Sequence, residues 1–360
     1  MGEPRPNTAP GLLTDLLKSV SRSFYLTLRI LPSEIRRQIG LAYLLARASD
    51  TIADTDAVPV QARLHALEWL RQRVAGTANN PLDLARFCIA TPNTDGTRIG
   101  AVASDAERHL LLRLEEALQL LPGFPPDDQA HIRKVLEIIT AGQELDLRRF
   151  ELGRQSAAPG DGPRALQTWA EFDDYTYRVA GCVGEFWTRI CYAHLHDLDP
   201  ANLAEQLSDG VAFGQGLQMV NILRDLPKDL SNGRCYIPVE MLRDSGLAPL
   251  DLTNPAAMPR FRTLYMRLLD VAESRLTQGW TYSTRLARSQ RRVRLACAWP
   301  LLIGFRTIAH LRHANALDAS LRVKISRKEI RAVILRSLPG LISRRSWEQL
   351  PMWAKSPATG

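Results

Sequence analysis

The sequence predicts an all-α fold, and three observations support this class. Apolar residues recur with a period of about 3.6 over most of the 360-residue chain, as they do on helices that face a core. Alternating apolar and polar residues, which mark half-buried strands, are almost absent. Pro32-Ser33, Pro125-Pro126-Asp127 and Gly162-Pro163 stand where helical patterns begin. A hydrophobic content of 45% is enough to bury a large core.

Ten segments carry this helical period, and short breaks separate them. In the first half they are Gly11–Val20, Ser33–Thr55 after the Pro32 start, Val60–Ala75, Ala101–Leu121 after a break near Thr91–Gly100, and Asp127–Leu152 after the Pro125 start. In the second half they are Ala165–Leu195 after a break near Gln155–Pro163, Asn202–Leu226 before the Asn232-Gly233 turn signal, Met258–Arg288 after a break near Leu247–Pro259, Arg291–His313 and Arg327–Ser337. Each break is short enough to be a loop between helices.

No Pro-, Gly- or Ser-rich linker divides these segments, so we expect a single domain over residues 11–340. Residues 1–10 are expected to form a flexible N-terminus, and residues 341–360 a C-terminal tail. The tail mixes Leu, Ile, Trp and Met with Arg, which suits a segment resting on a membrane surface; packing on the domain and disorder are the alternatives.

Targeting signals are weak. The N-terminus lacks the apolar core of a signal peptide, and the apolar run Ala296–Phe305 is too short to span a bilayer. We therefore expect a cytoplasmic protein, either free or peripheral on the inner membrane surface.

The chain is basic, with a formal net charge of +8 and a pI near 9.5, and Arg greatly outnumbers Lys. Nucleic acid, anionic membrane and phosphorylated substrates all fit this sign. Arginines are spread along nearly every segment, which argues against a nucleic-acid interface. The Arg-rich stretches Arg285–Arg294 and Arg322–Arg336 suit either solvated helix faces or a surface that meets acidic lipid. Five cysteines without a CxxC motif, and histidines without companion ligands, argue against disulfides and structural zinc.

Two aspartate pairs at helical spacing carry the strongest chemical signal. They are Asp50-Thr-Ile-Ala-Asp54 and Asp225-Leu-Pro-Lys-Asp229, and no other Asp is followed by Asp four residues on. Residues four apart share one face of a helix, so each pair aims two like charges at one place. A cation between them makes this arrangement favourable, and carboxylates suit Mg²⁺, which takes its other ligands from water and phosphate. Chance alone gives about one such pair in a chain of this length, so the neighbours must decide.

The neighbours of the first pair favour a functional site over a solvated helix face. Steps of one helical turn back from Asp54 give Asp50, Arg47 and Tyr43, and the other sides of this segment are Leu, Ala and Ile. A polar stripe on a mostly buried helix needs partners for its charges, so the stripe predicts a bound charged ligand.

The second pair continues a similar stripe that contains Gln218, Asn221 and Arg224 between apolar flanks. Pro227 lies inside this pair and predicts that the helix kinks or begins to end there. Upstream, Gly214-Gln215-Gly216 is similar to part of a dinucleotide-binding loop. No strand precedes it and the third glycine is missing, so we expect close helix packing instead.

The chain resembles the squalene/phytoene synthases, which join two prenyl diphosphates head to head. The resemblance covers about residues 15–335, and its motifs stand in the family's order. The matching blocks are Ser21-Arg22-Ser23-Phe24, the segment from Tyr43 to Asp54, the segment from Tyr175 to Gly184, and the segment from Gln218 to Asp229 followed by Gly233–Pro238.

The resemblance implies an isoprenoid-synthase helical bundle around a deep apolar tunnel, with the two aspartate motifs facing each other at its mouth. It implies that Asp50, Asp54, Asp225 and Asp229 hold Mg²⁺, or Mn²⁺ in its place, which bridges the substrate diphosphate. The substrate-binding side chains would be Ser21, Arg22, Phe24, Tyr43, Arg47, Gln218, Asn221, Arg224 and Arg234. Guanidinium groups suit this task because their fork binds two phosphate oxygens at once.

The implied chemistry explains these residue types. An allylic C–O bond ionises only if the leaving diphosphate is stabilised, which cations do electrostatically. The resulting allyl cation must meet a C=C bond and not water, so the tunnel must be dry. Tyr175 aligns with a tyrosine that the family uses near proton removal. A purely structural role for Tyr175, capping a buried diphosphate network, is the alternative.

Two features favour the squalene branch, in which two molecules of farnesyl diphosphate pass through presqualene diphosphate and are reduced by NADPH. Arg47-Ala48 before Asp50-Thr51 looks like the squalene synthase form of the motif. The basic segment Val323–Lys328 resembles the one that squalene synthases use near NADPH, which assigns Lys324 and Arg327 to the cofactor; a solvated face is the alternative.

Two features depart from the eukaryotic squalene synthases. The segment Ala141–Leu147 is closer to the phytoene synthase pattern, and Ala296–Pro300 carries alanine where those enzymes have a tunnel phenylalanine. The runner-up interpretations are therefore a phytoene, dehydrosqualene or presqualene diphosphate synthase without reduction. A non-catalytic scaffold is a third interpretation, which the presence of all four aspartates opposes. The sequence does not decide the oligomeric state.

Overall fold

The computed structural model describes residues 12–21, 24–81, 83–88, 91–92, 98–99, 104–152 and 162–356. The predicted all-α class is confirmed, because helices dominate these residues and every strand among them is two residues long. Contacts divide the chain into two compact units, and no linker in the sequence marks this division. The N-terminal unit comprises Met1–Glu151 and Arg189–His194, and the C-terminal unit comprises Leu152–Thr188 and Leu195–Gly360.

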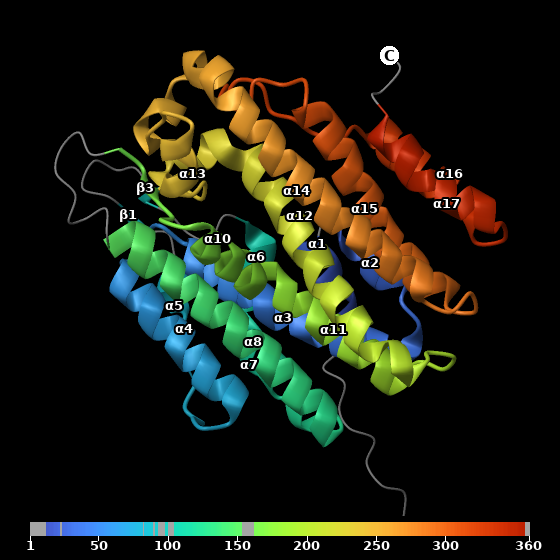
Figure 1. Cartoon of the computed structure of the whole chain (residues 1–360). Helices are drawn as coiled ribbons and strands as arrows, with labels where there is room; N and C mark the ends of the chain where they lie inside the picture. The colour runs from blue at the N-terminus through green and yellow to red at the C-terminus, as the bar shows by residue number, and fades with distance from the viewer. Residues whose placement is uncertain are drawn as a thin grey trace, which may run out of the picture. The chain divides into compact units, whose positions relative to one another are not determined.

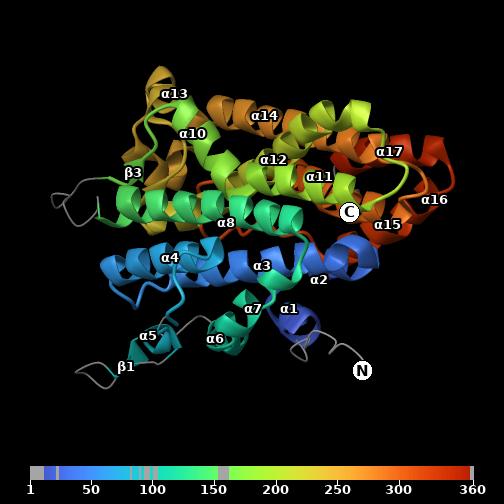
Figure 2. The ribbon, with the colours of Figure 1, turned by 90° about the horizontal axis from the view of Figure 1, so that it is seen from below.

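Helix α3 (Ser33–Asp54) is the centre of the N-terminal unit (Figure 2). It packs against helices on several sides, which are α1 (Leu17–Ser21), α2 (Phe24–Ile30), α4 (Val60–Ala75), α6 (Asp105–Leu112), α7 (Leu114–Leu118) and α8 (Pro126–Asp146). The segment η1 (Leu12–Leu16) precedes α1, and η2 (Leu121–Gly123) and η3 (Leu147–Leu152) flank α8. The short helix α5 (Ala85–Cys88) is followed by β1 (Thr91–Pro92) and β2 (Arg98–Ile99), which pair antiparallel with Thr91 opposite Ile99.

The period of α3 explains its central place. Leu41, Leu44, Leu45 and Ile52 are fully buried, and they lie on the face of the helix opposite the polar stripe. Extended Pro32 precedes the first turn, in agreement with the predicted start. The stripe therefore lies on a helix that the core holds rigidly.

Helices α12 (Leu203–Ser231), α14 (Met258–Arg285) and α15 (Arg291–Leu311) lie side by side in the C-terminal unit (Figure 1). Against α12 pack α10 (Trp169–Thr176) and η4 (Tyr177–Gly181), which lead into α11 (Cys182–His194). Strands β3 (Arg164–Ala165) and β4 (Arg234–Cys235) pair parallel, with Arg164 opposite Arg234. The remaining elements are η5 (Pro200–Asn202), α13 (Val239–Asp244), η6 (Pro249–Thr253), η7 (Pro255–Ala257), α16 (Arg327–Gly340) and α17 (Arg344–Lys355).

Glycines allow the backbone of α12 to approach its neighbours closely. A Cβ placed on Gly214 would lie 2.1 Å from the carbonyl oxygen of Ala180, and one on Gly184 would lie 1.8 Å from the carbonyl oxygen of Gly210. Both contacts are far inside van der Waals distance, so no other residue fits without moving the helices. The close packing predicted for Gly214-Gln215-Gly216 is thus confirmed, and the absence of a preceding strand agrees with the rejection of a dinucleotide loop.

The C-terminal residues fold onto α15. Helix α17 packs against both α15 and α16, and Trp347 is buried with its ring stacked on Trp280 at 5.0 Å between centroids. The described part of the tail thus packs on the C-terminal helices. No helix in the described part of the chain is both long and apolar enough to cross a bilayer.

Some predicted helices differ from the structure. The segment Ala101–Leu121 is interrupted at Arg113, where the backbone leaves the helical region and the guanidinium binds Glu116. The segment Ala165–Leu195 starts as β3 and becomes helical only after Thr168, whose hydroxyl accepts a hydrogen bond from the amide of Glu171. Helix α12 continues five residues past Leu226.

Candidate functional site

The first aspartate pair lies on the solvent-accessible face of α3. Tyr43, Arg47 and Asp50 are half-buried, Asp54 is exposed, and the flanking apolar side chains are buried, as the stripe predicts. Arg47 Nη1 lies 3.9 Å from Asp50 Oδ2, and its other terminal nitrogen donates to Glu107 on α6. The Glu107 carboxylate therefore positions the guanidinium of Arg47 beside Asp50. No sequence motif predicted this contact.

Asp50 has an unusual electrostatic environment. Burial and the nearby Asp54 carboxylate raise its pKa to about 7, although Arg47 and a 2.6 Å hydrogen bond from Gln143 Nε2 oppose the change. The Asp50 side chain is 46% exposed, so solvent screens part of this effect. A divalent cation at this carboxylate would reverse the shift.

The second aspartate pair lies within the last turns of α12. Gln218, Arg224, Asp225 and Asp229 are half-buried and Asn221 is exposed, while Ile222, Leu223 and Leu226 between them are buried. The expectation that this helix ends or kinks at Pro227 is wrong in one respect, because α12 runs on to Ser231. The predicted Asn232-Gly233 turn follows it, with Gly233 at a φ of 74°.

A tyrosine from α14 explains how the helix continues through Pro227. Pro227 has no amide hydrogen, so the carbonyl of Leu223, four residues earlier, loses its normal helical partner. The hydroxyl of Tyr265 donates to this carbonyl at 3.1 Å, and both residues are buried. Burial raises the pKa of Tyr265 above its usual value, so the hydroxyl stays a donor. Asp225 and Asp229 thereby share one helical face.

Arg224 binds the neighbouring Asp225 with both branches of its guanidinium. Nε donates to Oδ1 at 3.0 Å and Nη2 donates to Oδ2 at 2.6 Å, and both side chains are about one-third exposed. This fork is the geometry that arginine also uses on phosphate. Each aspartate pair thus has its own arginine within ion-pair distance.

Tyr175 is buried on α10, and its ring stacks on that of Tyr236 at 4.6 Å between centroids. Asp173 holds this helix in place, because its side chain accepts a hydrogen bond from Arg275 on α14 and another from Gln215 on α12 at 3.3 Å. The stacking fixes the orientation of the Tyr175 ring, and an aromatic face is suited to stabilise a cation. The sequence blocks contained Tyr236, but nothing in them indicated the stacking.

The other predicted residues lie on other elements or outside the described residues. Ser21 is buried with its hydroxyl bound to the carbonyl of Leu17, Arg22 lies outside the described residues, and so does the side chain of Phe24. Arg234 lies on β4, directly after the turn that ends α12. Lys324 and Arg327 are exposed at the start of α16, and neither makes an ion pair with another described residue.

The donors fit a hard divalent cation. Within the described part of the chain, no group of three or more His, Cys, Asp or Glu residues is arranged to hold a metal ion. Mg²⁺ does not need one, since it binds through one or two carboxylates and completes its shell with water and phosphate. Asp50 and Asp54, whose mutual repulsion contributes to the raised pKa of Asp50, are such a pair.

Comparison with known proteins decides the family. A sequence profile described as squalene/phytoene synthase matches residues 17–329, which is most of the chain. The chain belongs to the squalene/phytoene synthase family. Members of this family are prenyltransferases.

Curated relatives in the family carry different names. A bifunctional lycopene cyclase/phytoene synthase from Blakeslea trispora is 26% identical over 294 residues, which cover 81% of this chain and 43% of the relative. A presqualene diphosphate synthase from Zymomonas mobilis is 28% identical over 241 residues, covering 67% of this chain and 64% of the relative. The chain thus spans about two-fifths of the length of the bifunctional relatives that it matches.

Solved structures of the family share the fold. The structure of TcSQS with a ligand has a TM-score of 0.73 at 21% identity, and covers 94% of this chain and 88% of the other. A dehydrosqualene synthase structure has a TM-score of 0.60 at 19% identity, with 94% of each chain covered. These likenesses support the all-α isoprenoid-synthase fold.

Proposed function

We propose that this chain joins two molecules of farnesyl diphosphate head to head, forms presqualene diphosphate, and reduces it with NADPH to squalene. The observation that carries the proposal is the repeated unit of two aspartates and one arginine on a rigid helix. In α3 this unit is Arg47, Asp50 and Asp54, and in α12 it is Arg224, Asp225 and Asp229.

Each unit is suited to ionise an allylic diphosphate. The aspartates would hold Mg²⁺, which when bound withdraws charge from the leaving diphosphate. Arg47 and Arg224 would bind its oxygens through their forks, with Arg234 as a further cation on β4. Since the helices fix these groups in advance, no reorganisation is needed as charge develops on the leaving group.

Tyr175 has the surroundings of a group that acts near the carbocation. Stacking on Tyr236 fixes the orientation of its ring, and an aromatic face stabilises a cation without reacting with it. Its hydroxyl can receive or relay the proton that is lost. Removing the hydroxyl should therefore lower turnover more than it weakens substrate binding.

The reductive step is supported by the surroundings of Lys324 and Arg327. Both side chains are exposed and lie at the N-terminus of α16, where the helix dipole adds to their positive charge. Phosphate groups of NADPH are suitable partners for such a cluster. Lys324→Gln with Arg327→Gln should raise the KM for NADPH and leave the formation of presqualene diphosphate unchanged, and Arg243→Gln on α13 is an exposed control.

A second candidate is a synthase that omits the reduction. It is favoured by the relatives named phytoene synthase and presqualene diphosphate synthase. Its product would be presqualene diphosphate from farnesyl diphosphate, or phytoene from the longer geranylgeranyl diphosphate. The Asp and Arg residues would act in the same way, so only the fate of the cation differs.

Product analysis distinguishes the candidates. The purified chain is incubated with farnesyl or geranylgeranyl diphosphate and Mg²⁺, with and without NADPH, and the products are identified by mass spectrometry. Squalene that appears only with NADPH supports the proposal, and a product unchanged by NADPH favours the second candidate. Asp225→Asn should abolish either product, whereas Asp244→Asn, an exposed aspartate on α13, should retain it. An inactive parent chain would contradict both.

A further inference from the structure

The outer face of α16 carries an apolar stripe that no part of the described chain covers. Leu335 is 65% exposed, Leu338 is 45% exposed and Ile342 is 82% exposed. Their spacing of three and four residues places them on one face of the helix. Ile342 extends this face by one turn, because its amide donates to the carbonyl of Pro339 at 3.1 Å. We call these three residues the α16 stripe.

The stripe is separate from the face that holds α16 to the protein. Val333, Ser337 and Gly340 are buried on the inner side, and the Ser337 hydroxyl accepts a 3.0 Å hydrogen bond from the indole of Trp299 on α15. A Cβ on Gly340 would lie 3.0 Å from the ring of Trp347. Since the inner face already supplies the packing, the α16 stripe has no role in it.

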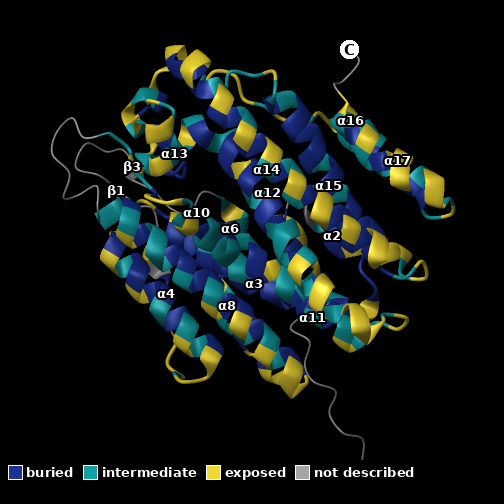
Figure 3. Cartoon of the chain, in the orientation of Figure 1, coloured by how far each residue is buried: buried dark blue, intermediate teal, exposed yellow. Residues whose placement is uncertain are grey.

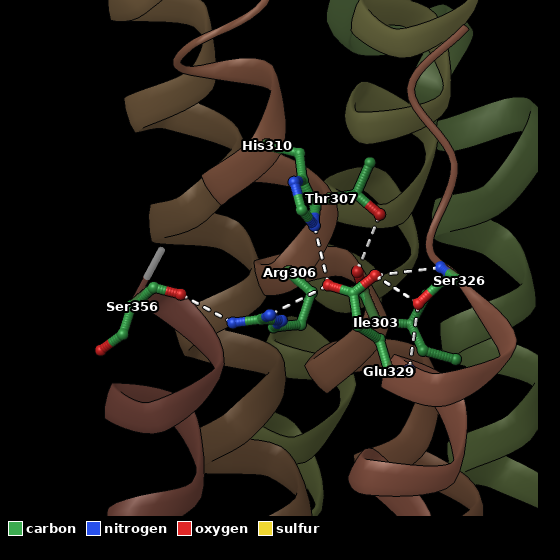
Figure 4. Close-up of polar contacts among 7 residues, drawn as sticks. All are labelled: Ile303, Arg306, Thr307, His310, Ser326, Glu329 and Ser356. Atoms are coloured by element: carbon green, nitrogen blue, oxygen red, sulfur yellow. Dashed lines mark hydrogen bonds and ion pairs between the residues drawn. The ribbon is translucent and has the colours of Figure 1, made fainter. Parts of the chain in front are cut away.

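Polar contacts fix the start of the same helix (Figure 4). Glu329 accepts hydrogen bonds from Arg306 at 2.9 Å and from the ring of His310 at 2.8 Å, and it closes a capping box with Ser326. Arg306 also binds the carbonyl of Ser356 at the end of α17. The helix therefore presents its stripe from a rigid support.

The charge around the stripe is strongly positive. Residues 322–345 contain eight Lys and Arg and one Glu, so the formal net charge of this segment is +7. The net charge of the whole chain is +8. The one acid, Glu329, is occupied by Arg306 and His310. Arg331 and Arg345 are exposed and make no ion pair with another described residue. Exposed residues recur along this part of the molecule in Figure 3.

We infer that the α16 stripe and its flanking arginines dock on the surface of an anionic lipid bilayer. Apolar side chains that point outward gain by entering the acyl boundary, and arginines beside them are attracted to anionic headgroups. A second copy of the chain is disfavoured as the occupant, because a symmetric contact would bring two such basic faces together. Nucleic acid would use the cations and leave the apolar stripe in water. The inference does not depend on the proposed function.

Vesicle binding tests this surface. The full chain is sedimented with vesicles of phosphatidylcholine alone and of phosphatidylcholine with phosphatidylglycerol. Binding to the anionic vesicles is expected, and added salt should weaken it. Leu338→Ser with Ile342→Ser should reduce the partition coefficient on the order of tenfold or more. Arg331→Gln with Arg345→Gln should reduce the binding and its dependence on salt.

Matched controls make the result specific. Leu112→Ser with Leu250→Ser removes two side chains that are 66% and 55% exposed outside α16, and it should bind like the parent chain. Circular dichroism checks that all variants fold. Equal binding to neutral and anionic vesicles, or an equal loss in the control, would overturn the inference. A lipid-free dimer that the stripe variant dissociates, seen by analytical ultracentrifugation, would also overturn it and assign the surface to a second copy.

Discussion

Replacing Tyr265 by Phe tests whether α12 depends on this hydroxyl to continue through Pro227. The change removes one oxygen and leaves the ring in its buried site. The carbonyl of Leu223 then has neither an amide four residues on nor the hydroxyl that binds it at 3.1 Å. An unpaired buried carbonyl costs about 1–3 kcal/mol, which is the expected loss in the free energy of unfolding.

The same change should also alter the aspartate pair. Without the hydroxyl, the carbonyl of Leu223 can find a hydrogen-bond donor only if the helix opens at Pro227 and admits water. Such an opening moves Asp229 relative to Asp225. We therefore expect a higher Mg²⁺ concentration at half-maximal rate, in addition to the lower stability. The assays are urea unfolding and a Mg²⁺ titration of the initial rate or, for a readout independent of turnover, calorimetry of Mg²⁺ with inorganic diphosphate.

A rescue and a control sharpen this prediction. Pro227→Ala restores an amide donor for the carbonyl of Leu223, so the double variant with Tyr265→Phe should recover most of the lost stability and Mg²⁺ affinity. Tyr282→Phe on the same helix removes a buried hydroxyl that lies 3.3 Å from Thr188 Oγ1, and it should leave the Mg²⁺ dependence unchanged. The reasoning fails if Tyr265→Phe matches the parent chain in both assays, or if Pro227→Ala gives no rescue.

Three further predictions follow from the geometry. Gly214→Ala places a Cβ 2.1 Å from the Ala180 carbonyl oxygen and should lower the free energy of unfolding by about 1–3 kcal/mol in thermal unfolding. Gly123→Ala, whose Cβ would have no atom within 4 Å, should leave it unchanged. Equal effects of the two changes would disprove the close-packing account. Burial and the neighbouring carboxylate raise the pKa of Asp50 from its ordinary value of 3.8 to about 7. In the metal-free protein, the free energy of unfolding should therefore fall as the pH rises from 3.8 toward 7. Mg²⁺ should therefore raise the melting temperature more above pH 7 than below it, and Asp50→Asn should remove that difference. Burial would raise the pKa of Glu329, but hydrogen bonds from His310 and its other partners outweigh it and lower the pKa to about 2. The ionised Glu329 therefore stabilises the folded protein above its ordinary pKa of 4.5, and this stabilisation is lost as the pH falls toward 2. Acid unfolding that is unchanged in Glu329→Gln would contradict this.

The sequence was sufficient for features that depend on local pattern. The period of Ser33–Asp54 predicted both the buried sides of α3 and the half-buried stripe on it. The Asn232-Gly233 turn and the close packing at Gly214 also followed from local chemistry, because a positive φ and a missing side chain are properties of one residue.

Features that depend on a distant partner were not predictable. Pro227 indicates a helix end by itself, and only Tyr265, 38 positions later in the chain, reverses that expectation. Glu107 beside Arg47 and Tyr236 beside Tyr175 likewise come from other elements. Such pairs are fixed by tertiary packing, which overrides local propensity.

The fork between Arg224 and Asp225 has a consequence for how ligands assemble under the proposed function. Before any ligand arrives, the guanidinium neutralises the carboxylate and so competes with the incoming cation. A metal ion that displaces the guanidinium from Asp225 frees the two N–H groups of the fork to bind a phosphate. Metal and diphosphate then act as positive effectors of each other, and by linkage the coupling free energy is the same in both directions. Neither ligand alone would bind as tightly as the pair, so the site would respond to the metal–diphosphate complex rather than to free Mg²⁺.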